Sequence, residues 1–155
     1  MPRDEREFHR KIAARSFNLT WDYLDMKKRT TKDDLEMLSA AHSSRYHWHL
    51  VGTPRNLAIA DWQVSRVYAA IRQPQLSLQF AESSLDLCEG NGLADIIHTA
   101  YEALARAYAV AENYPKAEAY LRKARQQLDS LKLDKAERKL YLDQIHQTEL
   151  IAKKQ

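Results

Sequence analysis

The sequence predicts an all-α fold, and three observations lead to that prediction. Residues that favour helices are abundant, and the 155 residues include only three glycines and four prolines. No long alternating run of Val, Ile and Thr indicates a β-sheet. Apolar residues instead recur at helical spacing, and the same pattern returns at a fixed offset of 40 residues. We therefore expect one helical domain over residues 1–155.

The repeated pattern is clearest between Tyr101 and Ala124, where two short amphipathic helices flank a break at Asn113-Tyr114-Pro115. One face of the first helix carries Tyr101, Leu104, Ala105 and Tyr108, and one face of the second carries Ala117, Leu121 and Ala124. An offset of 40 residues aligns several identical pairs, namely Gly52/Gly92, Ala60/Ala100, Arg66/Arg106, Ala69/Ala109 and Ser44/Ser84. This offset predicts three repeats, at about 18–52, 58–92 and 98–131.

This unit resembles the tetratricopeptide repeat, a helix-turn-helix unit with large residues early in its first helix and small residues in its second. The resemblance implies a right-handed superhelical stack of about three helix pairs, whose first helices form a concave surface. The usual repeat has about 34 residues, so the additional residues here lie between units. A capping helix over residues 134–153 would cover the last repeat, because Asp134 with Glu137 resembles a capping box.

Local signals predict where the other helices begin and end. The first helix is expected over about Arg3–Arg29, with acidic residues near its start and basic residues near its end. Thr31 followed by Asp34 resembles a capping box for the second helix. Thr53-Pro54 is a typical start for the third helix, and Gly90-Asn91-Gly92 is a typical end for the fourth.

The charge and cysteine content argue against several classes of protein. A net charge of +3 with mixed signs does not indicate nucleic-acid binding, so we do not expect that partner. The single cysteine, Cys88, excludes an internal disulfide framework, and we expect it to be buried as a small hydrophobic residue. Because the sequence has no membrane-spanning apolar run and no signal region at its start, we expect a cytoplasmic chain without a membrane partner.

The resemblance also implies which residues face the concave groove. The positions carried over from the family are Asp22, Met26, Ile59, Trp62, Arg66, Thr99, Glu102 and Arg106, together with Leu19, Arg29, Ala69 and Ala109. Arg66 and Arg106 should lie on one side of the groove beside an exposed Trp62, where they would suit a carboxylate or a phosphate. Alternatively, both arginines pair with Glu102 or Asp61 and have a structural role. The family's chaperone-tail clamp requires Lys and Asn at positions that differ here, so that ligand is not expected.

Histidines form a second candidate site. His42, His47 and His49 lie within eight residues, and His98 precedes Glu102 by four, a spacing that can chelate a metal ion. A metal site built from His42, His49, His98 and Glu102 would require non-adjacent helices to meet. The other interpretations are packing at the junction between the first two repeats, or contact with a ligand. We expect packing, and we expect neither a metal ion nor another cofactor.

Together these features predict a binding module and not an enzyme. The expected partner is a protein or peptide bound in the concave groove, and the expected role is that of an adaptor or regulatory interaction domain. The pairs Ser43-Ser44 and Ser83-Ser84 lack a nucleophile elbow, and the sequence has no Gly-rich phosphate loop. Three alternatives stay open: a metal-dependent enzyme or metal-binding protein built on the histidines, nucleic-acid binding through Arg66 and Arg106, and a structural homo-oligomer.

Overall fold

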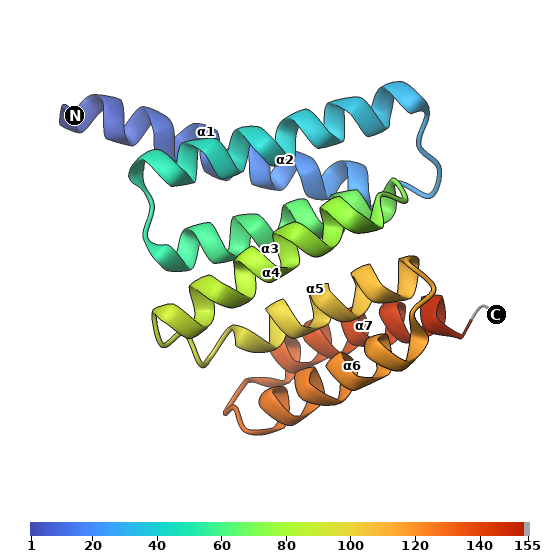
Figure 1. Cartoon of the computed structure of the whole chain (residues 1–155). Coiled ribbons are helices and arrows are strands. Elements are labelled where there is room, and N and C mark those ends of the chain that lie inside the picture. The colour runs from blue at the N-terminus through green and yellow to red at the C-terminus, as the bar shows by residue number, and fades with distance from the viewer. Residues whose placement is uncertain (154–155) are drawn as a thin grey trace.

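The computed structural model describes residues 1–153, which form seven helices joined by loops, and none of these residues lies in a strand (Figure 1). The all-α prediction is therefore confirmed. In chain order the helices are α1 (Arg3–Leu24), α2 (Thr31–Val51), α3 (Pro54–Ala70), α4 (Pro74–Gly90), α5 (Ile97–Val110), α6 (Tyr114–Asp129) and α7 (Lys135–Ala152).

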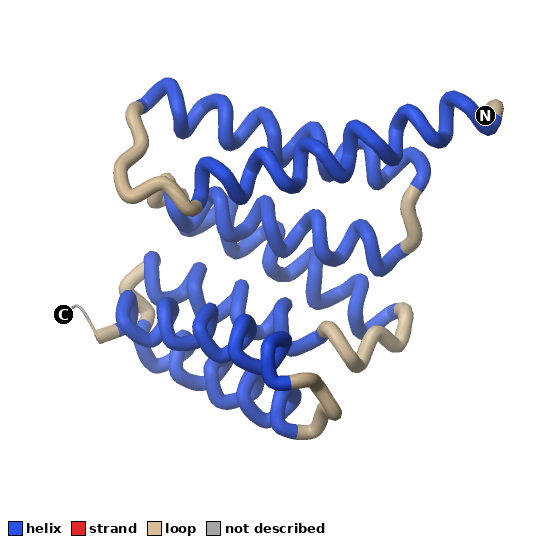
Figure 2. The backbone as a smooth tube through the Cα atoms, turned by 180° about the vertical axis from the view of Figure 1, so that it is seen from behind, coloured by secondary structure: helices blue, strands red, loops and turns tan. Residues whose placement is uncertain are grey.

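The helices stack as three consecutive pairs, α1 with α2, α3 with α4 and α5 with α6, followed by α7 (Figure 1). Contacts between first helices connect the pairs, because α1 touches α3 and α3 touches α5. Helix α7 touches both α5 and α6, so it continues the series of first helices. We call α1, α3, α5 and α7 the inner row. Seen from behind, α7 lies in front of its neighbours, and loops join the helices at both ends of the stack (Figure 2).

The ends of α3 and α5 confirm the 40-residue offset between the second and third pairs. The N–H of Gln73 donates to the carbonyl of Tyr68 at 2.8 Å, and the N–H of Asn113 donates to the carbonyl of Tyr108 at 2.9 Å. Between each donor and acceptor lies a residue with positive φ, Arg72 at 60° and Glu112 at 61°. These two helix ends thus have the same backbone conformation.

The first pair departs from that offset. The hydroxyl of Ser44 donates to the carbonyl of Ala13 at 2.9 Å, and the hydroxyl of Ser84 donates to the carbonyl of Ala58 at 2.8 Å. The two serines lie 40 residues apart, whereas the two carbonyl residues lie 45 apart. Helix α1 is therefore displaced by five residues relative to the expected alignment. The longer loop between α1 and α2, residues 25–30, accommodates the displacement.

The end of α1 and the start of α2 also differ from expectation. Helix α1 ends at Leu24 instead of Arg29, and Thr30, not Thr31, caps α2. The Thr30 hydroxyl accepts from the N–H of Asp33 at 3.1 Å, and the Asp33 carboxylate accepts from the N–H of Thr30 at 2.8 Å. Asp34 instead accepts from Arg29 Nε at 2.8 Å. The predicted start of α3 at Thr53-Pro54 is confirmed, and Asp134 caps α7 by accepting from the N–H of Glu137 at 2.8 Å.

The core runs through the middle of the stack along α3. Every residue from Ala60 to Ala69 is buried, because α3 is covered by α1, α2, α4 and α5. Met37 on α2 and Val64 on α3 belong to one fully buried cluster. Cys88 is buried as expected, and its burial raises the pKa of the thiol to about 11. Ser44 and Ser84 are fully buried at contacts between helices, where each hydroxyl donates to a carbonyl of the neighbouring helix.

Candidate functional site

A pocket of about 930 Å³ opens on the inner row. All four helices of the row contribute to its wall, among them Phe17 and Trp21 of α1, Ile59, Trp62 and Arg66 of α3, Thr99 and Arg106 of α5, and Tyr141, Gln144 and Gln147 of α7. Its volume lies within the range of about 300–1,000 Å³ that is usual for ligand sites. The wall combines aromatic and aliphatic side chains with a few polar groups, which is the usual composition of such sites.

Most of the residues predicted to face the groove lie at this pocket. Ile59, Trp62, Arg66, Thr99 and Arg106 all line it, and so does Arg29. Glu102 belongs to the same site because it bonds to two of these residues, Trp62 and Arg106. We refer to Glu102, Arg66 and Arg106 as the ion cluster.

Asp22 and Met26 are exposed and do not belong to the pocket wall. The five-residue displacement of α1 is the reason. With an offset of 45 instead of 40, the counterparts of Trp62 and Arg66 on α1 are Phe17 and Trp21, and both line the pocket. Their alignment could have been found from the sequence only by testing a second offset for the first helix.

The contribution of α7 to the pocket was not predicted, since this helix was expected only to cover the last repeat. Leu140, Gln144 and Gln147 lie at the pocket and follow i, i+4, i+7 spacing, so they share one face of the helix. That spacing was visible in the sequence. The sequence did not indicate which neighbouring helix this face of α7 would contact.

Glu102 is at the centre of the ion cluster and is only 3% exposed. Its carboxylate accepts hydrogen bonds from Trp62 Nε1 at 3.3 Å, Arg106 Nε at 3.1 Å and Thr148 Oγ1 at 2.7 Å. Burial by itself would raise the pKa of this carboxyl, but Arg106, Arg66 and the two neutral donors outweigh burial and hold the pKa below its usual value. Glu102 is therefore a carboxylate that joins α3, α5 and α7.

Arg66 is 7% exposed, and its guanidinium lies 5.3 Å from the ring centre of Trp21. Its Nη2 donates to Oε1 of Gln147 at 2.6 Å. Its Nη1 lies 3.5 Å from Glu102 Oε1, yet that nitrogen is buried without any hydrogen-bond acceptor. Burial, followed by the neighbouring Arg106, lowers the pKa of Arg66 to about 10, so the group stays charged at neutral pH.

The structure contains features of both interpretations of the two arginines. Both pair with Glu102, as the structural interpretation expects, whereas Asp61 instead pairs with Arg45. Two guanidinium groups share one carboxylate, however, so the ion cluster has a net charge of +1. Trp62 was expected to be exposed, but its ring is 6% exposed because it packs between α1 and α5 and bonds Glu102.

The histidines make separate contacts. His42 Nε2 lies 2.8 Å from the Tyr68 hydroxyl, and His98 is buried against the ring of Tyr141 with 4.5 Å between ring centres. His47 contacts His9 across the α1–α2 pair, with 2.7 Å between their Nδ1 atoms.

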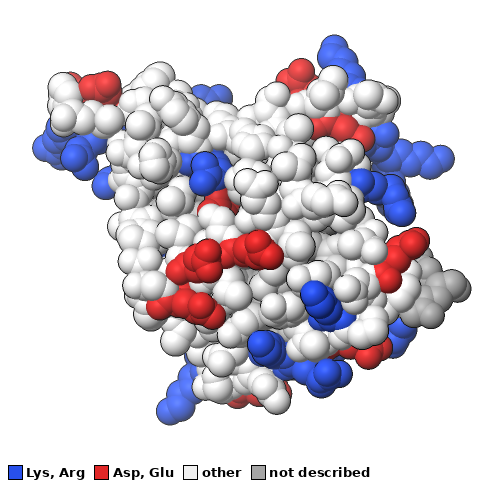
Figure 3. Space-filling model, viewed as in Figure 1, with Lys and Arg blue, Asp and Glu red and all other residues white. Residues whose placement is uncertain are grey.

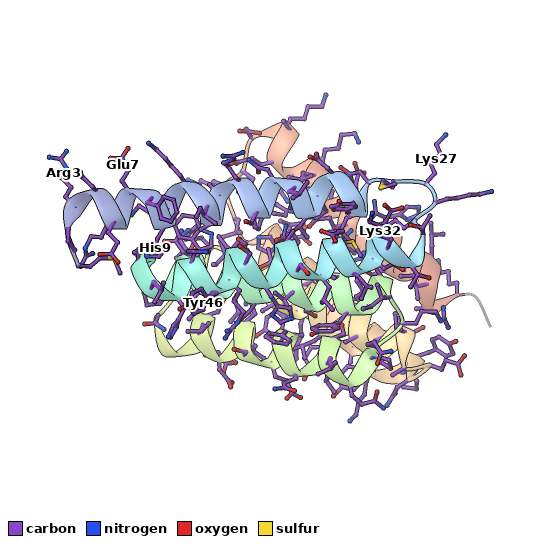
Figure 4. All side chains as sticks on the ribbon, turned by 90° about the horizontal axis from the view of Figure 1, so that it is seen from above. Arg3, Glu7, His9, Lys27, Lys32 and Tyr46 are labelled. Carbon is purple, nitrogen blue, oxygen red and sulfur yellow. The ribbon has the colours of Figure 1, made fainter. Side chains whose placement is uncertain are left out.

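Figure 4 shows His9 near the free end of α1, far from Lys27 at the other end. His49 is exposed. Within residues 1–153, no three His, Cys, Asp or Glu side chains are grouped as a set of metal ligands. Of the histidines expected to pack at the junction between the first two repeats, His42 contacts Tyr68 of the second pair, whereas His47 contacts His9 within the first pair.

The exposed face of α4 differs in charge from the pocket. Helix α4 carries Glu82, Asp86 and Glu89, all exposed, and no Lys or Arg. Figure 3 shows acidic side chains gathered over this helix, on the side opposite to the inner row. Four arginines, by contrast, line the pocket: Arg29, Arg55, Arg66 and Arg106, with Asp25 and Asp143 as the acidic residues.

Comparison with known proteins found no match to this chain among protein-family models, curated proteins or solved structures. The geometry of the stack and its pocket therefore carries the functional argument. No helix within residues 1–153 has both the length and the apolar character that crossing a membrane requires.

Proposed function

We propose that this chain is a tetratricopeptide-like binding module whose pocket on the inner row receives a peptide segment of a protein partner. The observation that carries the proposal is the pocket itself, which has a volume of about 930 Å³ and a wall to which all four helices of the inner row contribute. Recognition by a preformed concave surface is how stacked helical repeats bind their partners. The proposed role is therefore binding, as an adaptor or regulatory domain, and not catalysis.

The dimensions of the wall suit an extended peptide. On α3 the lining residues run from Arg55 to Ala70, a length of about 22 Å at 1.5 Å per residue. An extended chain rises about 3.3 Å per residue, so about six or seven residues would fit along this helix. Ile59, Phe17 and Trp21 offer apolar contact area to side chains of the peptide, and the ion cluster offers polar contacts.

The proposal is tested by selecting binders for the full chain from a displayed library of random 12-residue peptides and measuring the selected peptides by fluorescence anisotropy. Ala70 is exposed and lines the pocket, so Ala70→Trp should obstruct the groove without disturbing the core. We expect A70W to weaken binding by at least about tenfold, since the bulky ring removes contact area.

Ala14 supplies the matched control, because it is exposed on α1 and does not line the pocket. A14W should bind the selected peptides as the unmodified chain does. Equal binding by A70W, or a library that yields no binder at all, would show that the pocket is not a peptide site.

A further inference from the structure

The guanidinium of Arg66 is only partly used by the protein. Its Nη2 donates to Gln147, whereas its buried Nη1 lies 3.5 Å from Glu102 Oε1 without forming a hydrogen bond and has no other acceptor among the residues that the structure describes. An unpaired buried donor is rare and costly in folded proteins. Since Arg66 lines the pocket, a ligand that enters the pocket can supply the missing acceptor.

Gln147 is an unusual partner for a buried arginine. Its side chain is a neutral amide on an exposed residue of α7, and its oxygen accepts a hydrogen bond from only one arm of the guanidinium. A carboxylate has two oxygens that match the two arms, and its bonds to arginine are shorter and stronger than those of an amide. The ion cluster also has a net charge of +1, so one more carboxylate would neutralise it.

From this geometry we infer that Gln147 is a place-holder for an acidic side chain of the peptide, which displaces the Gln147 amide and binds the Arg66 guanidinium through both oxygens. The inference rests on the proposed function and specifies the chemistry of the peptide. The lining residues of α3 continue on both sides of Arg66, with Ile59 and Trp62 before it and Ala70 after it. The peptide can therefore pass Arg66, and a Glu or Asp within its sequence fits better than a chain end.

Two acidic residues also line the pocket and limit where a carboxylate can bind. Asp143 is paired with Lys139 at 2.6 Å, so its charge is largely balanced. Asp25 lies at the end of α1 and attracts the Arg66 guanidinium electrostatically. Arg29 and Arg55 are paired with Asp34 and Asp95 outside the ion cluster. Among the arginines that line the pocket, Arg66 is the one with a buried nitrogen that has no hydrogen-bond acceptor within residues 1–153.

The test uses two synthetic pools of random nine-residue peptides, amidated at the C-terminus, that differ only in a fixed central residue, Glu or Gln. Binding of each pool to the full chain is measured by equilibrium dialysis with mass spectrometry. The Glu pool should be retained about tenfold more strongly than the Gln pool, because only Glu offers two charged oxygens to Arg66. The amidated ends ensure that any preference comes from the side chain.

Substitution of Gln147 then separates a place-holder from a simple structural contact. Gln147→Glu would give Arg66 a carboxylate from the protein itself. The ratio of Glu-pool to Gln-pool retention should therefore fall by about tenfold, and the melting temperature of the protein should not decrease. Gln147→Ala removes the competitor and should leave binding of the Glu pool equal or stronger. Gln126→Glu makes the same chemical change on the exposed face of α6 and should alter neither pool.

The outcomes distinguish this inference from the proposed function. Equal retention of both pools, or Q147E that still prefers the Glu pool, would overturn the inference while the peptide-binding function stands. Loss of Glu-pool binding in Q147A would also overturn it, because Gln147 would then be needed for the ligand. If neither pool binds the unmodified chain, both the inference and the proposed function fail.

Discussion

Glu102 stabilises the fold because three helices place donors on one carboxylate. Replacement by Gln keeps the size of the side chain but leaves the guanidinium groups of Arg66 and Arg106 buried with no counter-charge. We predict that Glu102→Gln lowers the free energy of unfolding by about 3 kcal/mol, the usual cost of removing one partner from a buried ion pair. Urea denaturation followed by circular dichroism measures this difference.

Glu82 provides the control for that measurement, because it is exposed on α4 and E82Q removes the same charge from the surface. Its effect should stay within about 0.5 kcal/mol. If E102Q were as stable as the unmodified chain, the carboxylate would not hold the two arginines.

His98 makes stability depend on pH. Burial lowers the pKa of His98 from 6.5 to about 4, so the unfolded chain binds a proton between these values that the folded chain excludes. Lowering the pH from 7 to 4.5 should therefore favour unfolding, by about 2 kcal/mol from this residue. In His98→Phe the decrease in the free energy of unfolding between pH 7 and pH 4.5 should be smaller by that amount. Urea denaturation of both proteins at the two pH values measures the difference. His49→Asn, at an exposed position on α2, serves as the control at both pH values.

At the scale of helices, the ends of α3 and α5 contain strain that glycine would relieve. Arg72 and Glu112 have φ near +60°, a conformation that disfavours residues with a Cβ atom. Arg72→Gly and Glu112→Gly should each raise the free energy of unfolding by about 0.5–1 kcal/mol. Ala111→Gly is the matched control, because Ala111 has φ of −77° and should lose stability instead. A fall in the thermal midpoint of R72G or E112G would contradict this account.

The sequence predicted the number of helices, their pairing and several residues that line the pocket from α3 and α5, because apolar spacing and the 40-residue offset depend on local pattern. Arg66, Arg106 and Glu102 were found together since that offset places them on neighbouring first helices. The displacement of α1 was not predicted, because no Gly or Pro marks the helix end after Leu24. That end instead depends on Arg29, which bonds Asp34 and the carbonyl of Tyr23.

The absence of a hydrogen-bond acceptor at Arg66 Nη1 could not be predicted from the sequence either. Whether Glu102 satisfies one guanidinium or two depends on distances of a few tenths of an ångström. Gln147 reaches Arg66 only because α7 packs against α5, and the register of that contact depends on side chains from two distant segments. Such contacts follow from tertiary packing, which single-sequence patterns do not encode.

For the whole molecule, burial predicts an uneven distribution of local stability. Residues 60–69 of α3 are buried without interruption, whereas residues 1–8 are all exposed. We predict the slowest amide hydrogen exchange in α3 and in the middle of α5, and fast exchange in the first two turns of α1. Hydrogen exchange followed by mass spectrometry tests this order. Protection in residues 3–8 equal to that of α3 would indicate a contact that covers the free end of α1.

Tandem duplication of one helix pair would copy its charged residues together with its fold. Arg66 and Arg106 are the same residue of successive copies, but the counterpart of Glu102 in the preceding copy is Trp62. A further copy of the second unit would therefore add a buried cation without an anion, whereas a further copy of the third unit would bring Arg106 together with Glu102. Growth of the array without added net charge at this place therefore requires copies of the third unit and not of the second.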